Sequence, residues 1–347
     1  MVGGRIRVAM AGVGHWHGPR HLESVLAAGA RIVGVYDPLA PVAERFARDL
    51  ECLVYDDWRA LFQDSRPDLA LIMGRPNDTG EMARCLLEEG LPFVAEKPLG
   101  THAGRLAPLV DLERERGAFA AVALAMRYSP LWAKLGELRE QGRLGPVTHA
   151  HFRIINGPPT RYARDGVGWM LDPEVAGGGP VINLGIHCTD AFCWLVSEPV
   201  EVVSAQVSYL MHGERIEDFG AAMLRSESGV IGTVEAGYTY PSMGAGGKSS
   251  GDREWRVSSG VAYLIEDGKS LRVVNMDGQE ESCACPPSGE YYARLHADVL
   301  DCLRQGRPAP ITIADCYRAL QLVDRIYEKA GVRPSGGPLL RGTGSGE

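Results

Sequence analysis

The sequence contains no apolar run close to the roughly 20 residues that a membrane-spanning helix requires. Its start, MVGGRIRVAMAGVG, is too short and too interrupted by glycine for a secretory signal peptide. Positive charge is in deficit, because 36 lysines and arginines face 44 aspartates and glutamates, for a formal net charge of −8. An acidic chain has no electrostatic reason to approach nucleic acid or an anionic membrane. We therefore expect a cytoplasmic protein whose partners are small molecules.

Regular cysteine spacing is also absent. The eight cysteines include no C-x-x-C pair, which argues against a disulfide framework or a zinc ribbon and predicts reduced thiols. Cys283-Ala-Cys285 is the one close pair, and it lacks the further ligands that a zinc site needs. No role is assigned to Cys283 or Cys285.

Short apolar runs alternate with helix-like segments over the first 125 residues. Helix-sized segments with apolar residues at intervals of three and four separate strand-sized runs, which predicts a parallel sheet covered on both faces. The predicted strands are Arg5–Ala11, Arg31–Tyr36, Asp68–Met73, Pro92–Ala95 and Phe119–Leu124, and the predicted helices are Pro19–Ala28, Pro41–Leu50, Thr79–Glu89 and Gly104–Arg116.

The pattern changes after residue 126. A helix over Leu131–Gln141 and a long loop lead to the helical run Val181–Val196, and strands separated by hairpin-type turns follow. The predicted strands are Val200–Met211, Phe219–Arg225, Val230–Tyr240, Glu254–Val257, Val261–Glu266 and Leu271–Met276, and the closing helices are Tyr291–Gln305 and Ile313–Ala330. The fold class is thus α/β: an N-terminal domain with a parallel sheet over residues 1–125, and a C-terminal α+β domain with a large, mostly antiparallel sheet over residues 126–331. The glycine-rich residues 332–347 are expected to form a flexible tail, and residues 242–252 are either a loop over a site or a long hairpin connection.

Gly12-Val13-Gly14 lies between the first predicted strand and the first predicted helix. Glycines in this context permit a tight turn and let the backbone approach a pyrophosphate at the helix N-terminus. Asp37 follows the second predicted strand, 25 residues after Gly12 (37 − 12 = 25), where a carboxylate can bind both ribose hydroxyls and repel the extra phosphate of NADP. NAD is therefore favoured over NADP, with a turn residue before Pro38 as the alternative role of Asp37.

Three histidines follow the glycine turn in the stretch GHWHGPRH. His17 stands where the third glycine of G-x-G-x-x-G is expected, and Gly18 comes one position late, so the helix is expected to start differently or to lie farther from the strand. The spacing of His17 and His21 would suit a metal, but no acidic or sulfur ligand is nearby in the sequence. We predict no metal site, and we consider His15 and Trp16 as cofactor or substrate contacts, with packing as the alternative.

Two further segments carry polar groups at positions where ligands bind. Lys97 follows the fifth predicted strand and so stands at the carboxyl edge of the parallel sheet, although a solvated turn lysine is the alternative. Asn183, His187 and Asp190 have helical spacing after Gly177-Gly178-Gly179-Pro180, so they share one face of an apolar helix. A buried polar network in the core is the alternative for this stripe.

These segments together resemble the Gfo/Idh/MocA oxidoreductase family. The matching pieces are AGVGHWH, GVYDP, RPN, AEKPLG and GGGPVINLGIHCTD, in the order typical of the family, across residues 6 to 200. The resemblance implies a Rossmann domain followed by a domain whose open sheet often forms a dimer face, and it implies a homodimer or homotetramer. It also implies that Lys97 and His187 belong to the active site, and that Asn183 stands where the family usually has aspartate.

The resemblance and the residues together define a predicted site for an oxidoreductase that acts on a secondary alcohol or ketone of a sugar, cyclitol or related polyol. Because imidazole has an ordinary pKa near 6.5, His187 suits the role of general acid/base, and Lys97 would stabilise charge on the reacting oxygen. Asn183 would orient the substrate hydroxyl, and Asp190 would orient His187. The predicted cofactor contacts are Gly12, Val13, Gly14, His15, Trp16, Asp37, Pro38, Arg75, Pro76, Asn77, Glu96 and Lys97, and the predicted substrate contacts are Lys97, Arg127, Tyr128, Trp169, Asn183 and His187.

Two other functions compete with net oxidation. A redox-neutral, NAD-dependent glycoside-cleaving enzyme would keep its cofactor and return the hydride. A sensor of NAD or sugar would have kept the fold and lost catalysis. The presence of both Lys97 and His187 argues against a sensor, whereas Asn183 argues mildly for one.

Overall fold

The computed structural model describes residues 4–242, 251–333 and 337–338 of the chain. Two compact units divide it: the first comprises Met1–Ala133, Asp165–Val167 and Pro286–Tyr317, and the second comprises Lys134–Arg164, Gly168–Cys285 and Arg318–Glu347. None of the helices among the described residues has both the length and the apolar character that crossing a membrane demands.

The first unit contains a six-stranded parallel sheet in the order β3-β2-β1-β4-β5-β6, the strand order of dinucleotide-binding folds. Its strands are β1 (Arg7–Ala11), β2 (Arg31–Tyr36), β3 (Leu53–Tyr55), β4 (Leu69–Ile72), β5 (Phe93–Ala95) and β6 (Ala120–Val122). Its helices before residue 129 are α1 (Gly18–Ala27), α2 (Ala40–Ala47), α3 (Trp58–Ser65), α4 (Pro76–Glu89), α5 (Ala103–Arg116) and the 3₁₀ helix η1 (Ala125–Tyr128). The predicted parallel sheet is confirmed; only the edge strand β3 escaped prediction, because it has three residues and two of them are exposed.

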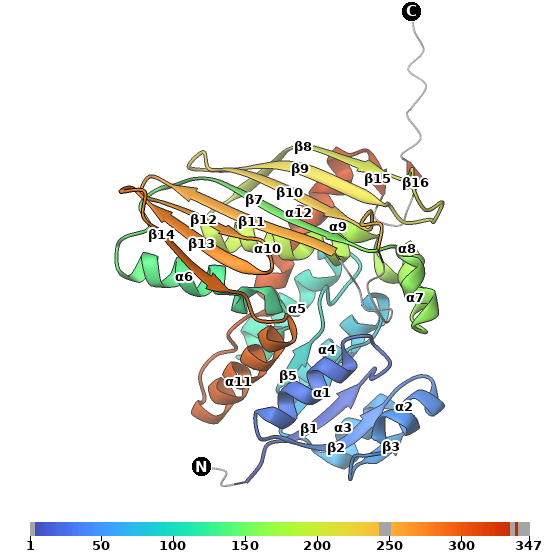
Figure 1. The fold of residues 1–347 in the computed structure, drawn as a ribbon. Coiled ribbons are helices and arrows are strands. Elements are labelled where there is room, and N and C mark those ends of the chain that lie inside the picture. The colour runs from blue at the N-terminus through green and yellow to red at the C-terminus, as the bar shows by residue number, and fades with distance from the viewer. Residues whose placement is uncertain (1–3, 243–250, 334–336, 339–347) are drawn as a thin grey trace, which may run out of the picture. The chain divides into compact units, whose positions relative to one another are not determined.

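A late segment of the chain completes the first unit. Helix α11 (Gly289–Gln305) packs along α1, and Figure 1 shows the two helices side by side. The backbone N–H of Val122 in β6 donates to the carbonyl of Ile311 at 2.9 Å. Helix α12 (Ile313–Lys329) begins in this unit and continues into the second.

The second unit is built on an eight-stranded sheet in the order β14-β13-β12-β11-β7-β10-β9-β8. Its strands are β7 (Val147–Asn156), β8 (Val200–Ser208), β9 (Phe219–Ser226), β10 (Ile231–Gly237), β11 (Gly251–Ser259), β12 (Ala262–Glu266), β13 (Ser270–Asn275) and β14 (Glu280–Ala284). Its helices are α7 (Thr160–Arg164), η2 (Gly168–Leu171), α8 (Pro173–Ala176), α9 (Pro180–Asn183) and α10 (Gly185–Val196), and α6 (Pro130–Glu140) leads into it. Neighbouring strands are antiparallel apart from the parallel pair β7 and β10, so the prediction of a mostly antiparallel sheet is confirmed.

Strand β7 is the main element that was not predicted, since a loop was expected there. Its buried Ala150, Phe152 and Ile154 alternate with the polar His149, His151 and Arg153, as in a strand with one buried face, so the expectation of a loop was wrong. The strand lies between β11 and β10, hydrogen-bonded on both sides.

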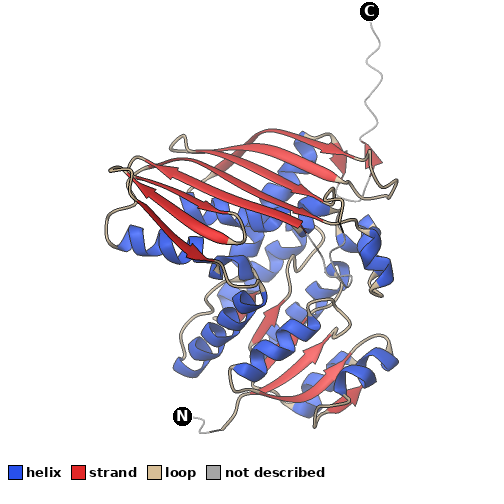
Figure 2. Ribbon diagram, in the orientation of Figure 1, coloured by secondary structure: helices blue, strands red, loops and turns tan. Residues whose placement is uncertain are grey.

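One face of the second sheet is covered by helix α10, which contacts β7 and β10. Figure 2 shows the strands of this sheet in red and its helices in blue. The strands alternate between buried and less buried residues, and Val203, Met223 and Ile231 are 36%, 43% and 37% exposed. Apolar side chains on the uncovered face leave it available for a further contact.

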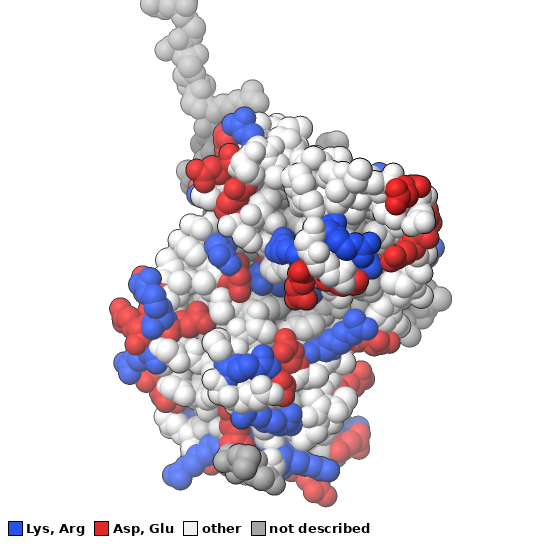
Figure 3. All heavy atoms as spheres, turned by 90° about the vertical axis from the view of Figure 1, so that its left-hand side faces the viewer, with Lys and Arg blue, Asp and Glu red and all other residues white. Residues whose placement is uncertain are grey.

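Charged side chains are mixed on the face that Figure 3 shows, where basic and acidic groups alternate without a large area of one sign.

All eight cysteines carry free thiols, as predicted. The short strands β15 (Val332–Arg333) and β16 (Gly337–Pro338) pair with each other. The rest of the predicted flexible tail, and residues 243–250 of the predicted glycine-rich loop, lie outside the described residues.

Candidate active site

The glycine turn lies at the carboxyl end of β1. The backbone N–H groups of Gly12 and Val13 donate to the carbonyl of Tyr36, the last residue of β2, at 2.8 and 3.3 Å. Gly12 has a φ of +77°, and a Cβ there would lie 2.8 Å from the backbone of Met73. The turn is therefore held between the ends of two neighbouring strands, where a side chain at Gly12 would not fit.

Gly18 performs the packing role of the third glycine, one position late. It is the first residue of α1, and a Cβ there would lie 2.4 Å from the carbonyl oxygen of Val13. The turn is thus one residue longer than the common pattern, and His17 occupies the added position before the helix. The expected departure at the start of the helix is real, but close packing against the turn is preserved.

Asp37 follows β2 and faces the glycine turn. Its Oδ2 accepts from the N–H of Gly14 at 2.7 Å, and its Oδ1 accepts from the N–H of Leu39 at 3.0 Å. The carboxylate is 9% exposed. A glycine turn, a helix N-terminus and an acidic group in this arrangement fit the diphosphate and a ribose of a dinucleotide.

Arg75, Pro76 and Asn77 lie at the carboxyl end of the adjoining strand β4, where α4 begins at Pro76. The carbonyl of Arg75 accepts from the Oγ1 of Thr79 at 2.7 Å. Arg75 and Asn77 are exposed and Pro76 is buried. These predicted cofactor contacts therefore lie along the same edge of the sheet as the glycine turn.

Lys97 and Glu96 directly follow β5, and both are buried, at 4% and 3% exposure. The backbone N–H of Glu96 donates to the carbonyl of Ile72 in β4 at 2.9 Å, which extends the sheet by one residue. The backbone N–H of Lys97 donates to the Oε2 of Glu96 at 3.0 Å. Lys97 is thus a buried lysine rather than a solvated turn residue.

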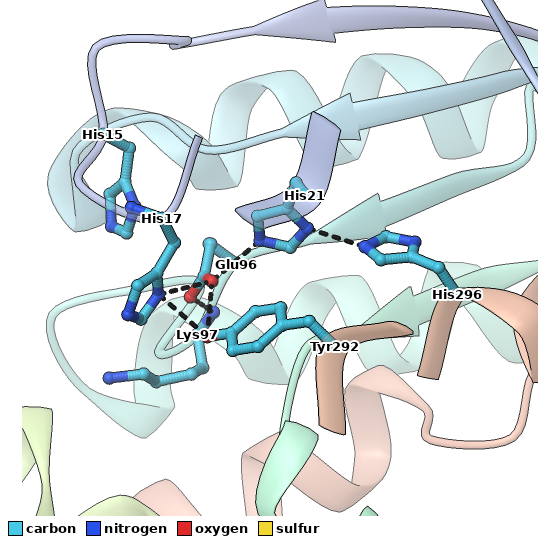
Figure 4. A network of polar contacts seen from close by, with 7 residues as sticks. All are labelled: His15, His17, His21, Glu96, Lys97, Tyr292 and His296. Atoms are coloured by element: carbon cyan, nitrogen blue, oxygen red, sulfur yellow. Dashed lines mark hydrogen bonds and ion pairs between the residues drawn. The ribbon is translucent and has the colours of Figure 1, made fainter. Parts of the chain in front are cut away.

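Glu96 is the centre of a buried cluster that Figure 4 shows. Its Oε1 lies 2.8 Å from His17 Nδ1 and 2.8 Å from His21 Nε2, and it accepts from Tyr292 Oη at 3.2 Å. His21 Nδ1 in turn lies 2.7 Å from His296 Nε2. The sequence showed no acidic neighbour for the histidines; the fold supplies one from a loop 75 or more residues away.

The carboxylate determines where the protons of this cluster lie. Because a carboxylate only accepts, His17 Nδ1 and His21 Nε2 must both carry hydrogen. One hydrogen lies between His21 Nδ1 and His296 Nε2, which are 2.7 Å apart. The other ring nitrogen of His296 is buried and has no hydrogen-bond partner among the described residues.

Burial keeps the imidazoles of His15, His17 and His296 neutral. It lowers the pKa of His17 to about 4, although Glu96 acts in the opposite direction. It also lowers the pKa of His15 and of His296 well below 6.5. Burial alone would raise the pKa of Glu96, but the proximity and hydrogen bonds of His17 and His21 hold that pKa well below its usual range. Glu96 is therefore an anion near the neutral rings of His15, His17 and His296 at neutral pH.

Lys97 titrates closer to neutrality than an ordinary lysine. Burial lowers the pKa of Lys97 to about 8, and Glu96 opposes that change. A lysine of this kind can donate a hydrogen bond and release a proton near physiological pH.

His15, His17 and Glu96 each place one ligand atom within 4.8 Å of the others, and they form the one such group of three in the part of the chain that the structure describes. Glu96 already accepts from three side chains and one backbone N–H. His15 Nδ1 accepts from the backbone N–H of His17 at 3.1 Å. A metal ion would have to displace these bonds, so the absence of a metal site stays our prediction.

Arg127 and Tyr128, predicted as substrate contacts, are in η1 and bind elements of the same unit. Arg127 Nη2 lies 3.3 Å from Asp315 Oδ1, and Tyr128 Oη donates to Asp298 Oδ2 at 2.7 Å. These bonds anchor η1, which follows β6, to α11 and α12. They give both residues a structural role.

Asn183 and His187, in the second unit, are both 7% exposed. The predicted single helix is two: α9 ends at Asn183, and α10 begins at Gly185. His187 is on the first turn of α10, where its N–H donates to the carbonyl of Leu184 at 3.1 Å. Asp190 is one turn further along and 3% exposed.

The GGGP segment owes its glycines to packing within the protein. A Cβ at Gly178 would lie 2.2 Å from Tyr327 Oη, and one at Gly179 would lie 2.6 Å from the carbonyl oxygen of Glu217. The carboxylate of Glu217 accepts from the N–H of Gly179 at 2.9 Å and from the N–H of Val181 at 3.0 Å. This buried carboxylate fixes the start of α9 and therefore the position of Asn183.

Asn183 belongs to a polar group that sequence reasoning missed. Its Nδ2 donates to Tyr162 Oη at 2.9 Å and to Tyr238 Oη at 2.8 Å, and Arg161 Nη2 donates to Tyr162 Oη at 2.8 Å. Tyr162 and Arg161 are on α7, and Tyr238 follows β10. No local pattern marks this group, since Tyr162 is 21 positions from Asn183 and 76 positions from Tyr238. Trp169, on η2, is half-buried.

Comparisons with known proteins agree with these features. A model described as "Oxidoreductase family, NAD-binding Rossmann fold" matches residues 6–124, and the "GFO/IDH/MocA C-terminal domain" matches residues 132–257. The chain is 25% identical to scyllo-inositol 2-dehydrogenase (NAD(+)) of Bacillus subtilis over 68% of each chain, and 24% identical to D-glucoside 3-dehydrogenase of Escherichia coli over 95% of this chain and 97% of the relative. A solved structure of levoglucosan dehydrogenase with NADH and levoglucosan has a TM-score of 0.82 at 20% identity, covering 94% of this chain and 97% of the other.

Proposed function

Because this chain belongs to the GFO/IDH/MocA family of NAD-dependent oxidoreductases, we propose that it transfers a hydride between NAD and a secondary alcohol or ketone of a sugar, cyclitol or related polyol. The substrates in the names of its relatives, an inositol and a glucoside, support this class. The observation that carries the proposal is Lys97, a buried lysine with a pKa of about 8 at the carboxyl edge of the sheet that also holds the glycine turn.

The residues proposed to hold the cofactor all lie in the first unit. The turn would hold the diphosphate, Asp37 a ribose, and the residues after β4 and β5 the nicotinamide half. Asp37 favours NAD over NADP because its carboxylate would face the extra phosphate. The cofactor contacts are proposed to be Gly12, Val13, Gly14, His15, Trp16, Asp37, Pro38, Arg75, Pro76, Asn77, Glu96 and Lys97.

When bound, the nicotinamide supplies the hydride acceptor. Lys97 is proposed to donate a hydrogen bond to the reacting oxygen and to stabilise negative charge on it. His187 is proposed to take the hydroxyl proton as general base and to return it in the reverse direction. Asn183 is proposed to position the substrate, since its amide is held by Tyr162 and Tyr238.

Turnover of a polyol panel with NAD, followed by NADH absorbance, tests this function. We expect Lys97→Ala and His187→Ala each to lower kcat/KM by about 100-fold or more, because each removes a proton-transfer or charge-stabilising group. Lys269→Ala and His149→Ala, which change exposed residues of the same types, are the controls. Full turnover in both active-site variants would remove the assigned roles, and glycoside cleavage without NADH release would indicate the redox-neutral reaction instead.

We further propose that the protein is cytoplasmic and forms a homodimer or homotetramer through the uncovered face of the second sheet. The exposed Val203, Met223 and Ile231 on that sheet support such a contact. Measuring the mass in solution of Met223→Glu beside the parent protein tests it, and an unchanged mass would exclude this face.

A further inference from the structure

Arg161 is a buried cation without a carboxylate partner among the described residues. It is 7% exposed, and its hydrogen bonds go to neutral acceptors: Nη1 to the carbonyl of Gly157 at 2.6 Å and Nη2 to Tyr162 Oη at 2.8 Å. Its guanidinium carbon also lies 4.5 Å from the ring centre of Tyr162 and 5.4 Å from that of Tyr238. These contacts use only part of the hydrogen-bonding capacity of a guanidinium.

Two arginines that are less buried than Arg161 do have carboxylate partners. Arg253 pairs with the fully buried Glu266 at 2.7 Å, and Arg127 pairs with Asp315 at 3.3 Å. Burying a charge without an opposite charge is strongly unfavourable, so proteins usually pair such groups. Arg161 therefore has the environment of a residue whose counter-ion comes from outside the chain.

The hydroxyl groups next to Arg161 add a second unused donor. Tyr162 Oη accepts from Arg161 and Asn183, and it donates to Tyr238 Oη at 3.3 Å. Tyr238 Oη accepts from both Asn183 and Tyr162, which leaves its own hydrogen without an acceptor among the described residues. Burial raises the pKa of Tyr238 well above 10, although Arg161 acts in the opposite direction, so the hydroxyl keeps that hydrogen.

The unused donors lie beside the proposed substrate-positioning residue. Arg161 follows β7 and Tyr238 follows β10, and these two strands are parallel neighbours, so both residues are at the same end of the sheet. Asn183 contacts Tyr238 directly and is one hydroxyl away from Arg161. An aspartate at position 183 would supply an internal negative charge here, but the amide of Asn183 supplies none.

We propose that the substrate is an anionic polyol whose carboxylate or phosphate group binds to Arg161 and Tyr238. This inference rests on the proposed function, since it names the chemical class of that substrate. The anion supplies the missing charge for the guanidinium and the missing acceptor for the tyrosine hydroxyl. Sugar acids and sugar phosphates share this chemistry, whereas neutral sugars and inositols do not.

Calorimetric titration of the NAD-loaded protein tests the inference directly. The probes are D-gluconate and D-glucuronate for carboxylates, glucose 6-phosphate for phosphates, and glucose and myo-inositol as neutral ligands. We expect at least one class of anion to bind about tenfold or more tightly than the neutral probes, as a buried charge-assisted contact implies. Equal affinity for charged and neutral probes, or no binding of any anion, would overturn the inference.

Two variants locate the anion. Arg161→Met should weaken the binding of anions at least about tenfold more than it weakens the binding of the neutral probes. Arg225→Met, which removes the same charge from an exposed residue paired with Glu201, should change neither. Should Arg161→Met fail to fold, the nearly isosteric Asn183→Asp provides the second test, because an internal carboxylate beside the same hydroxyls should weaken anion binding. Anion binding that survives Asn183→Asp and Arg161→Met would place the anion elsewhere.

The same samples distinguish the two proposals. An acid that binds through Arg161 but yields no NADH would contradict the proposed function and leave the anion site standing. NADH formation from neutral polyols without preference for their acids would contradict the anion site and leave the oxidoreductase function standing.

Discussion

The two units each contain a buried polar cluster, and the two clusters are built in opposite ways. Around Glu96, a carboxylate accepts from His17, His21 and Tyr292, so the donors have an anion to bind. Around Tyr238, donors outnumber acceptors, and the cation Arg161 has only neutral partners. The first cluster, which we call balanced, supplies an internal anion to its donors, and the second, unbalanced cluster supplies none.

This difference distinguishes a cluster that supports the structure from a cluster that can recognise a ligand. A balanced cluster holds its members in place without a ligand, because its donors already bind a carboxylate. An unbalanced one leaves charge and hydrogen-bonding capacity for a molecule from outside. We therefore expect changes in the Glu96 cluster to alter stability and the titration of Lys97, and changes around Arg161 to alter the choice of substrate.

The largest effect is expected from Glu96→Gln, which removes the anion of the balanced cluster. The amide places a donor opposite existing donors, so the free energy of unfolding should fall by about 3 kcal/mol, measured by urea denaturation. Because Glu96 raises the pKa of Lys97, that pKa should fall below about 8 and move the alkaline limb of the pH–rate profile to lower pH. The exposed Glu137→Gln is the control. Unchanged stability together with an unchanged pH profile would show that Glu96 does not hold the cluster.

Gly18→Ala should have the next largest effect, because the added methyl group displaces α1. This helix contributes His21 to the Glu96 cluster. The added Cβ would lie 2.4 Å from the carbonyl oxygen of Val13, and such overpacking costs about 1–3 kcal/mol. Affinity for NAD should fall as well, and fluorescence titration with NADH measures it. Gly136→Ala, within helix α6 and with no atom within 4 Å of its Cβ, should instead be neutral or gain up to about 1 kcal/mol. Equal results for both variants would refute the packing role of Gly18.

A smaller effect is the loss of folding stability at acidic pH, and it arises from the balanced cluster alone. His17 has a pKa of about 4 in the folded protein, and the pKa values of His15 and His296 are also lowered, whereas unfolded histidines titrate near 6.5. Stability is unaffected above pH 6.5, and it falls as the pH drops toward 4 because the unfolded state then binds more protons. Each such histidine contributes about 1.4 kcal/mol per pH unit within that window.

His296→Gln should make that slope shallower by about the contribution of one histidine, while its amide still offers a donor to His21. Denaturation at a series of pH values measures the slope. His149→Gln, at an exposed position, should leave the slope unchanged. A parental slope in His296→Gln would mean that His296 is protonated in the folded protein.

The smallest expected effect is that of a chelator, which should be none. The ligand atoms of Glu96 and His15 are already used in hydrogen bonds, so NAD should bind equally well with and without EDTA. Weaker binding after chelation would instead assign His15, His17 and Glu96 to a metal ion.

Much of the first unit could be predicted from the sequence because its signals are local. The glycine turn, Asp37 and Lys97 each directly follow a short apolar strand, and parallel strands bring their carboxyl ends to one edge. The helical spacing of Asn183 and His187 was equally visible, although the break at Leu184 was not, because apolar residues continue through it.

The remaining parts of both clusters depend on contacts between distant segments. Tyr292 and His296 reach α1 from 275 positions away, and Tyr162 meets Tyr238 across 76 positions. Strand β7 alternates polar and apolar residues, but that alternation does not reveal its pairing with β10, which places α7 and Arg161 next to that strand. Hydrophobic periodicity cannot report such pairings, since it records only which face of an element is buried.

The return of the chain to its first unit has a consequence for synthesis. Helix α11 contributes Tyr292 and His296 to the nucleotide-binding unit, so a nascent chain carries an incomplete Rossmann core until almost the whole protein has left the ribosome. Domains generally fold in the order in which they are made. Here the second unit can form its eight-stranded sheet before the first receives α11, and α12, which is made last, contributes to both units.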